Sequence, residues 1–249
     1  MRWRVALIDS CGAWPGAVDA AAFVDESAAA ACDTATRGVR RCATGADATG
    51  HGSRLARLLS DGDAVFELML GQVFWGQMPA SAAAVAAALD WAVAGGANLI
   101  HMSLGLAADR AVLAGAVSRA VSAGCVVVAS APARGGVVYP AAYRGVIRGT
   151  GDARCGTGEL SCLGPGFFGG CPRWVTGGTE EGVAGAGGGG GVVGVGAGAS
   201  VGAAWVTRSI LSEPTRRNAS EVIDLLTKKA SYRGRERIGR RDDLSCCGF

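Results

Sequence analysis

A regular alternation of short apolar segments with longer helical ones, between residues 65 and 150, is the feature that most constrains the fold. Strands that alternate with helices of about 10 to 15 residues form β–α–β units, whose strands lie parallel in one sheet. The expected strands are 65–73, 99–103, 126–129 and 146–148, and the expected helices are 81–94 and 109–123. The sequence therefore predicts an α/β fold with a mostly parallel sheet.

Two further segments have clear patterns. Residues 5–8 are apolar and are followed by Asp9 and a turn-forming stretch, which predicts a buried strand that ends at a turn. Residues 219–229 have helical spacing, with Asn218 or Ser220 placed to cap the start of the helix. Open α/β sheets place their sites just past the carboxyl ends of parallel strands. Asp9 is therefore a candidate site residue, and its alternative role is that of a turn residue bonded to its own backbone.

The remaining segments lack a clear periodic pattern. Residues 20–31 fit either a helix or a loose surface segment, and residues 32–50 fit a loop rich in Gly, Thr and Asp. Residues 151–197 are rich in Gly and Cys, which predicts an irregular insertion. We expect one domain over residues 1–230, followed by an exposed, arginine-rich tail over residues 231–249.

Composition excludes several classes of protein. Of the 249 residues, 49% are hydrophobic and 18% are charged, which is typical of a globular chain. The net charge is only +3 and the arginines are scattered, so no basic stripe predicts binding to nucleic acid. No apolar run approaches the roughly 18 residues that a transmembrane helix needs, and the apolar core at residues 5–8 is too short for a signal peptide. We expect neither nucleic acid nor a membrane as a partner.

The cysteines indicate a reducing compartment. Their number, nine, is odd in a chain with strong core patterning, which favours free thiols in the cytoplasm over a disulfide framework. Cys155, Cys162 and Cys171 are too widely spaced for a paired zinc-ligand motif, and the neighbours Cys246 and Cys247 have no histidine nearby. We therefore expect a cytoplasmic protein without a metal site.

Ser200 lies between a glycine-rich stretch and a run of small and apolar residues with helical spacing. A serine at such a helix start has two possible roles. As an N-cap, its hydroxyl accepts a hydrogen bond from a backbone N–H. As a nucleophile, it lies where the helix dipole and free N–H groups stabilise a developing oxyanion. A base and an orienting acid elsewhere in the chain are needed to favour the second role.

The chain has only two histidines, so a histidine base has few candidates. His51 lies between two glycines at the start of an amphipathic segment, and glycines allow a close approach of backbone or substrate to the imidazole. His101 lies inside an apolar strand, where a buried histidine with satisfied hydrogen bonds is the expectation. His51 is therefore the candidate base.

Asp9, His51 and Ser200 follow one another in the chain order of the subtilisin arrangement. The segments around them, V-A-L-I-D-S at residues 5–10, G-H-G-S-R-L-A at 50–56 and G-A-S-V-G-A at 198–203, resemble the aspartate, histidine and serine motifs of the subtilases, the subtilisin-like serine peptidases. Two other segments also resemble that family: G-A-N-L-I-H-M-S-L-G at residues 96–105, and A-G-C-V-V-V-A-S at 123–130 with Y-P-A-A at 139–142. The resemblance covers roughly residues 4–150 and 196–230.

The resemblance implies a subtilisin-like three-layer α/β/α fold and a serine endopeptidase that needs no cofactor. Ser200 would attack a peptide carbonyl, His51 would take the serine proton, and Asp9 would hold the imidazole in the required tautomer. The segment Ser103–Gly105, with Leu104 at its centre, would line the substrate cleft and pair with an extended peptide or protein substrate as an added strand.

The chain departs from the family at the oxyanion position. The family has A-A-G-N after the valine-rich strand, with the asparagine donating to the oxyanion, whereas residues 130–133 read S-A-P-A. The asparagine position is therefore Ala133, and the loss of one oxyanion donor slows a comparable enzyme by about 10²- to 10³-fold. Cys11 replaces a glycine, Ser53 a threonine, and Ala199 the threonine before the nucleophile. The resemblance thus implies a slow peptidase.

The chain begins close to the aspartate strand, which leaves no room for a signal peptide or a folding propeptide within eight residues. This favours a compact, dedicated processing enzyme that removes a leader or matures another protein. Short subtilases of this kind resemble the maturation protease associated with quinohemoprotein amine dehydrogenase assembly.

Three alternatives remain open. The first is a degenerate subtilase that binds peptides without cutting them, suggested by Ala133. The second is a nucleotide-binding α/β protein that uses the glycines of residues 194–198, although the acidic residue expected about 20 positions later is missing. The third is a cysteine hydrolase that uses Cys11, which the neighbouring carboxylate of Asp9 disfavours because it opposes thiolate formation.

Overall fold

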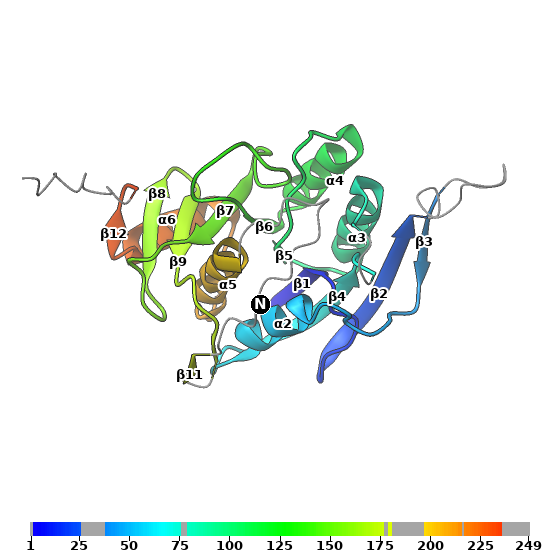
Figure 1. Cartoon of the computed structure of the whole chain (residues 1–249), viewed down its shortest axis with the longest axis horizontal. Coiled ribbons are helices and arrows are strands. Elements are labelled where there is room, and N and C mark those ends of the chain that lie inside the picture. Colours follow the sequence, from blue (N-terminus) through cyan, green and yellow to red (C-terminus); the bar gives the residue numbers. More distant parts are fainter. Residues whose placement is uncertain are drawn as a thin grey trace, which may run out of the picture.

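The computed structural model describes six stretches of the chain, residues 2–25, 38–75, 79–176, 179–180, 197–215 and 217–235. Their centre is a ten-stranded sheet, in the order β12-β8-β9-β7-β6-β5-β1-β4-β2-β3 (Figure 1). Neighbouring strands run parallel except for the β2–β3 and β8–β9 pairs. Its strands are β1 (Trp3–Asp9), β2 (Ala17–Asp25), β3 (Val39–Cys42), β4 (Phe66–Gln72), β5 (Leu99–Met102), β6 (Val126–Ser130), β7 (Val146–Gly151), β8 (Leu160–Gly164), β9 (Phe167–Gly170) and β12 (Tyr232–Arg233). A separate antiparallel pair is formed by β10 (Val175–Thr176) and β11 (Thr179–Glu180).

Helices cover both faces of the sheet, which gives three layers and confirms the predicted α/β/α fold class. They are α2 (His51–Ser60), α3 (Ala82–Ala94), α4 (Ala111–Ser122), α5 (Ala197–Leu211) and α6 (Ala219–Lys229). One core contains the buried side chains of α3 and α4, and the other contains those of α2, α5 and α6. Strand β6 divides its side chains between the two: Val127 and Ala129 belong to the first core, Val126 and Val128 to the second. No described helix is long and apolar enough to cross a membrane.

Helices α3 and α6 begin with a side-chain cap. Ser81 precedes α3, and its Oγ accepts a hydrogen bond from the N–H of Ala84 at 3.0 Å. Asn218 precedes α6 and forms a capping box with Glu221, in which each side chain accepts from the other residue's N–H at 3.0 and 2.9 Å. Of the two cap candidates for α6, the structure selects Asn218.

In four segments the described residues differ from the sequence expectation. Residues 17–25 form the strand β2, where a helix or a loose segment was the expectation for 20–31, and residues 39–42 of the expected loop form β3. The stretch 151–197, expected to be an irregular insertion, contains β8 and β9, which extend the main sheet. The expected tail contains β12, which pairs with β8, although residues 231–235 are mostly exposed as expected. Residues 26–37, 181–196 and 236–249 lie outside the described residues.

Glycines explain why the second half of the sheet resembles a loop in sequence. A Cβ on Gly170 of β9 would lie 2.7 Å from the Cβ of Trp205 and 2.8 Å from the carbonyl oxygen of Gly202, both in α5. A Cβ on Gly149 of β7 would lie 2.6 Å from the Cβ of Ala203. These glycines therefore allow α5 to pack directly on the strands, where composition alone suggested turns.

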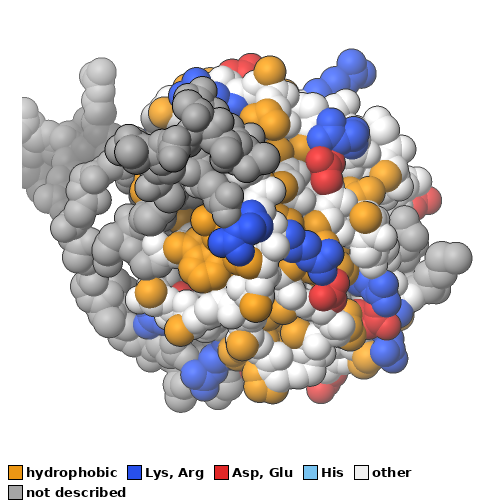
Figure 2. Space-filling view, turned by 90° about the vertical axis from the view of Figure 1, so that its right-hand side faces the viewer, with side chains coloured by type: hydrophobic (Ala, Val, Ile, Leu, Met, Phe, Trp, Pro, Cys, Tyr) orange, Lys and Arg blue, Asp and Glu red, His pale blue; other side chains and the backbone are white. Residues whose placement is uncertain are grey.

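The register brings several strand ends to one edge of the sheet. Asp9 pairs with Gln72 of β4, Ile8 with Met102 of β5, and Met102 with Ala129 of β6. Because these strands are parallel, their carboxyl ends lie side by side. On the face drawn in Figure 2, basic and acidic side chains are interspersed among hydrophobic and uncharged ones over the described residues.

Candidate active site

Asp9 and His51 meet at the carboxyl edge of the sheet. Asp9 is the last residue of β1 and is 1% exposed, and His51 is the first residue of α2. Nδ1 of His51 lies 2.8 Å from Oδ1 of Asp9, which also accepts hydrogen bonds from the N–H and the hydroxyl of Ser10 at 2.8 and 3.2 Å. The contact fixes the tautomer of a neutral His51, because a carboxylate accepts and Nδ1 must then carry the proton.

The start of α2 is held by side chains from outside the helix. Its N-cap residue, Gly50, has a φ of 66° and no side chain, so other groups must accept from the first four N–H groups. Asp47 accepts from Gly50 N at 2.8 Å and from Ser53 N at 2.7 Å. Thr49 Oγ1 accepts from His51 N at 3.2 Å, and Ser10 Oγ accepts from Gly52 N at 2.9 Å. All four N–H groups are satisfied, which fixes the backbone that carries His51.

Close packing sets the distance between this helix start and β1. A Cβ on Gly52 would lie 2.3 Å from the backbone nitrogen of Cys11 and 3.0 Å from that of Ser10. Gln72, at the end of β4 and fully buried, donates from Nε2 to the Ser10 carbonyl at 2.9 Å and accepts from Gly45 N at 2.7 Å. Gln72 thus ties the turn after Asp9 to the loop that precedes His51.

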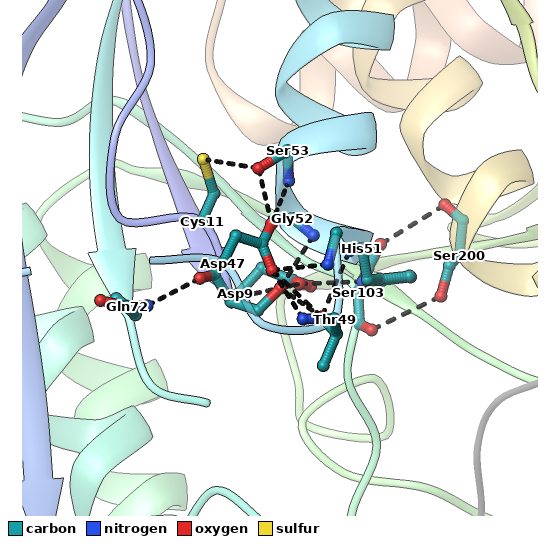
Figure 3. Close-up of polar contacts among 12 residues, drawn as sticks. Asp9, Cys11, Asp47, Thr49, His51, Gly52, Ser53, Gln72, Ser103 and Ser200 are labelled. Atoms are coloured by element: carbon teal, nitrogen blue, oxygen red, sulfur yellow. Dashed lines mark hydrogen bonds and ion pairs between the residues drawn. The ribbon is translucent and has the colours of Figure 1, made fainter. Parts of the chain in front are cut away.

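Ser200 is the fourth residue of α5 and is 2% exposed. An N-cap precedes the first helical residue, so the capping role is wrong for Ser200. Its Oγ donates to the carbonyl of Ser103 at 3.5 Å, and Ser103 Oγ donates to the carbonyl of Ser200 at 3.4 Å (Figure 3). Both contacts are long for O–H···O bonds. They join the start of α5 to the residue that follows β5.

The structure joins two of the three predicted catalytic residues directly. Asp9 bonds to His51, whereas the Ser200 hydroxyl is directed at Ser103, and no hydrogen bond links His51 to Ser200. Figure 3 shows α2, with His51, and α5, with Ser200, on either side of Ser103 in that view. The His51 side chain is 35% exposed, and its Nε2 has no hydrogen-bond partner among the described residues.

Negative charge around His51 favours its protonated form. Burial lowers the pKa of His51, but the Asp9 carboxylate, by its charge and its hydrogen bond, and the charge of Asp47 raise it more, so the net pKa lies above the ordinary value of 6.5. Arg54 opposes them weakly. The indole of Trp174 contacts the imidazole edge-on, with ring centroids 6.2 Å apart, and Arg54 lies over the same indole. The ring is thus fixed by Asp9 on one side and bordered by an aromatic wall.

Asp47 is held in its charged form. Burial raises its pKa, but hydrogen bonds from the side chain and N–H of Ser53, from Ser10 and from Gly50 N lower it more, and the net shift is downward. Its oxygens also lie 3.2 Å from both the N–H and the hydroxyl of Thr49. Asp47 is therefore a charged cap for α2 and a second source of negative potential at His51.

The structure gives less support to the predicted substrate-binding residues and to the predicted oxyanion position than to Asp9 and His51. Ser103, Leu104 and Gly105 are all buried, and Leu104 and Gly105 make no backbone hydrogen bond to another described residue. Ala133 is exposed in the bend after β6 and has no polar side chain. The position at which the resemblance places an oxyanion donor thus supplies none from its side chain.

Cys11 is a buried thiol beside Gly52 and Ser53, at the start of α2. It is 1% exposed and donates to the Ala13 carbonyl at 3.4 Å, and its Sγ lies 3.7 Å from Oγ of Ser53, which donates to Asp47 at 2.6 Å. Burial raises its pKa, and the charges of Asp47 and Asp9 add to that effect. The thiol is therefore disfavoured as a nucleophile. Of the glycines of the alternative phosphate loop, Gly194 and Gly196 lie outside the described residues, and Gly198 is the second residue of α5.

Sequence reasoning missed the support around Asp9 and His51. Asp47 and Thr49 are capping residue types just before the predicted helix start, and this signal was present in the loop composition, whereas Ser10 lies in the distant turn after β1. Gln72 gave no comparable signal, since it ends an apolar strand.

No group of three or more His, Cys, Asp or Glu side chains within the described residues could hold a metal ion. No family model matches the chain, and neither does any curated protein sequence.

Proposed function

We propose that this protein is a serine endopeptidase of the subtilase type, with Ser200 as the nucleophile, His51 as the general base and Asp9 as the orienting acid. The observation that carries the proposal is the 2.8 Å contact between Nδ1 of His51 and the buried Asp9 carboxylate. In the neutral imidazole it leaves Nε2 unprotonated, and no described residue is hydrogen-bonded to that nitrogen, which is the state that a general base requires.

The reaction begins with rotation of the Ser200 hydroxyl. Its contact with the Ser103 carbonyl, at 3.5 Å, is long and therefore weak, so the rotation toward His51 costs little. Ser200 Oγ then attacks the carbonyl carbon of the scissile peptide bond while Nε2 of His51 takes its proton. His51 returns that proton to the leaving amine, which gives an acyl-enzyme, and water hydrolyses the ester by the same proton transfers.

The oxyanion formed in this attack lacks the family's asparagine. Ala133 offers no side-chain donor, and loss of one such donor slows a comparable enzyme by about 10²- to 10³-fold. A slow turnover suits a dedicated processing enzyme that cuts a leader or matures one protein substrate. The six described cysteines are all free thiols, which supports a reducing compartment such as the cytoplasm.

The direct test is cleavage of a mixed peptide library, followed by mass spectrometry. The wild type and the control Ser209→Ala, a serine of the same helix farther along, are expected to release the same new termini. Ser200→Ala and His51→Gln are expected to release none. New termini of equal yield from Ser200→Ala would overturn the proposal.

The second candidate is a peptide-binding protein that retains the subtilase fold without cutting. The absence of a bond between His51 and Ser200 and the alanine at position 133 favour it. It predicts that a folded wild-type protein retains library peptides on a column and releases them uncut, with the same peptides retained by Ser200→Ala.

A further inference from the structure

His101 lies at the centre of the described structure, one strand away from the predicted catalytic pair. It is a residue of β5, it is fully buried, and it pairs in register with Leu7 of β1 and Val128 of β6. Both of its ring nitrogens have partners: Nδ1 lies 2.8 Å from the hydroxyl of Thr207 in α5, and Nε2 lies 2.8 Å from the hydroxyl of Ser103. The expectation of a buried, satisfied histidine is confirmed.

The partners of His101 lead to Ser200 through Ser103. The Ser103 hydroxyl has one hydrogen, which can go either to Nε2 of His101 at 2.8 Å or to the Ser200 carbonyl at 3.4 Å, and only the second choice links His101 to Ser200 by hydrogen bonds. Ser103 Oγ must then accept from His101, which places the proton on Nε2. A neutral imidazole has one N–H, so Nδ1 accepts from the hydroxyl of Thr207.

His101 also remains neutral across the working pH range. Burial lowers its pKa to about 4; Asp9 acts in the opposite direction and His51 in the same direction, and these are the charged groups that face it. A second proton would place N–H donors on both nitrogens, so that Nδ1 could no longer accept a hydrogen bond from the Thr207 hydroxyl.

We propose that His101 is a positioning residue for Ser200: it fixes Ser103, and through Ser103 the backbone of Ser200, relative to strand β5 and helix α5. The proposal rests on the proposed function of Ser200 as a nucleophile. Two links connect α5 to β5: His101 to Thr207, and Ser103 to Ser200. Their loss lets the start of the helix shift by a fraction of an ångström, and misplacement of about 1 Å can slow a reaction by roughly 10²-fold.

The tautomer gives a test that does not depend on activity. Nitrogen-15 NMR of the full chain distinguishes Nε2–H from Nδ1–H imidazoles, and with two histidines in the sequence, His51→Gln assigns both signals. We expect His101 as the neutral Nε2–H form from pH 5.5 to 8. A Nδ1–H or a protonated His101 in this range would overturn the proposal.

The functional test compares two substitutions at one site. His101→Phe fills the space but leaves the hydroxyls of Ser103 and Thr207 without their ring partner, whereas His101→Gln keeps one donor and one acceptor. We expect His101→Phe to lower kcat and the rate of fluorophosphonate labelling of Ser200 about 10- to 100-fold, with KM within about twofold. His101→Gln should recover part of the loss.

Thr207→Val is the test variant if His101→Phe does not fold. Thr207→Ser is its control, because it keeps the hydroxyl. We expect a severalfold slower labelling for Thr207→Val and wild-type labelling for Thr207→Ser. Folded His101→Phe and Thr207→Val proteins that label at the wild-type rate would overturn the proposal and leave the proposed function intact. A folded wild type that is not labelled at all would overturn the proposed function instead, while the tautomer measurement still stands.

Discussion

Oδ1 of Asp9 and Nδ1 of His51 lie 2.8 Å apart, although the two residues are separated by 42 positions in the chain. The other oxygen of Asp9, Oδ2, is buried without a partner. All described hydrogen bonds to this carboxylate, from His51 and Ser10, thus converge on one oxygen. The arrangement orients the imidazole strongly and makes Asp9 hard to replace.

Replacement of Asp9 by Asn is expected to lower kcat by about 10⁴-fold, as in comparable serine peptidases, because an amide nitrogen at this position favours the wrong tautomer of His51. The measurement is single-turnover cleavage of the best library peptide. Asp63→Asn, at an exposed carboxylate, is the control and should keep wild-type rates. An Asp9→Asn protein within tenfold of the wild type would contradict the assigned role.

The pH dependence of activity should follow His51. Only the neutral imidazole takes a proton, so kcat/KM is expected to rise with pH through a pKa above 6.5. Asp47 contributes to that raised pKa, so Asp47→Asn should move the rise to lower pH. A rise at the same pH in both proteins would show that Asp47 does not act on His51.

Asp47 should also contribute to stability. Its pKa is depressed in the folded state, so its contribution is present above the ordinary carboxyl pKa and is lost as the pH falls through the lower folded value. Loss of the bonds to Gly50 N and Ser53 N in Asp47→Asn should cost about 0.5–2 kcal/mol in the free energy of unfolding at pH 7. Urea unfolding at pH 7 and pH 3 measures the free energy of unfolding of the wild type and of Asp47→Asn. The difference between these two free energies should shrink at the lower pH.

Gly52 should tolerate no side chain. An added Cβ would lie 2.3 Å from the backbone nitrogen of Cys11, so Gly52→Ala must move α2 away from Asp9, at a cost of about 1–3 kcal/mol in stability and a large loss of activity. Gly115→Ala in α4 is the matched control. Its Cβ would meet only the flexible end of Arg119, at 3.3 Å, and should stabilise the helix by about 0.5–1 kcal/mol. Equal melting temperatures for the two variants would refute this account.

An asparagine at position 133 should accelerate the enzyme. In the proposed mechanism, Ala133→Asn supplies a side-chain donor at the position that the resemblance assigns to the oxyanion, and it should raise kcat by about tenfold or more. Val137→Asn, in the same exposed loop, is the control and should leave kcat unchanged. A folded Ala133→Asn protein with unchanged kcat would show that position 133 does not face the oxyanion.

The sequence predicted those parts of the fold where periodicity and capping agree. Helix α3 was predictable because Ser81 precedes an apolar helical run, and β5 and β6 because they are continuous apolar segments. Strands β8 and β9 were not predictable, because Gly170 and its neighbours serve packing against α5 and mimic loop composition. Long-range packing decides such positions, and a local pattern does not record it.

The candidate site likewise contains residues that the sequence could predict and residues that it could not. Asp9 and His51 were predictable because each lies at the end of a recognisable element, and they meet because the start of α2 lies against the end of β1. Ser200 was predicted at the start of its helix but lies one turn inside it. Gln72 and the chain from His101 to Ser103 depend on tertiary contacts between distant segments, which one sequence does not reveal.

Fluorophosphonate labelling followed by peptide mapping tests the central claim most directly, because the probe reacts with a serine only when a base activates it. The account predicts one adduct per wild-type molecule, on the peptide that contains Ser200, no adduct in Ser200→Ala, and wild-type labelling in Ser209→Ala. A folded wild-type protein without an adduct, or with an adduct on another residue that persists in Ser200→Ala, would contradict it.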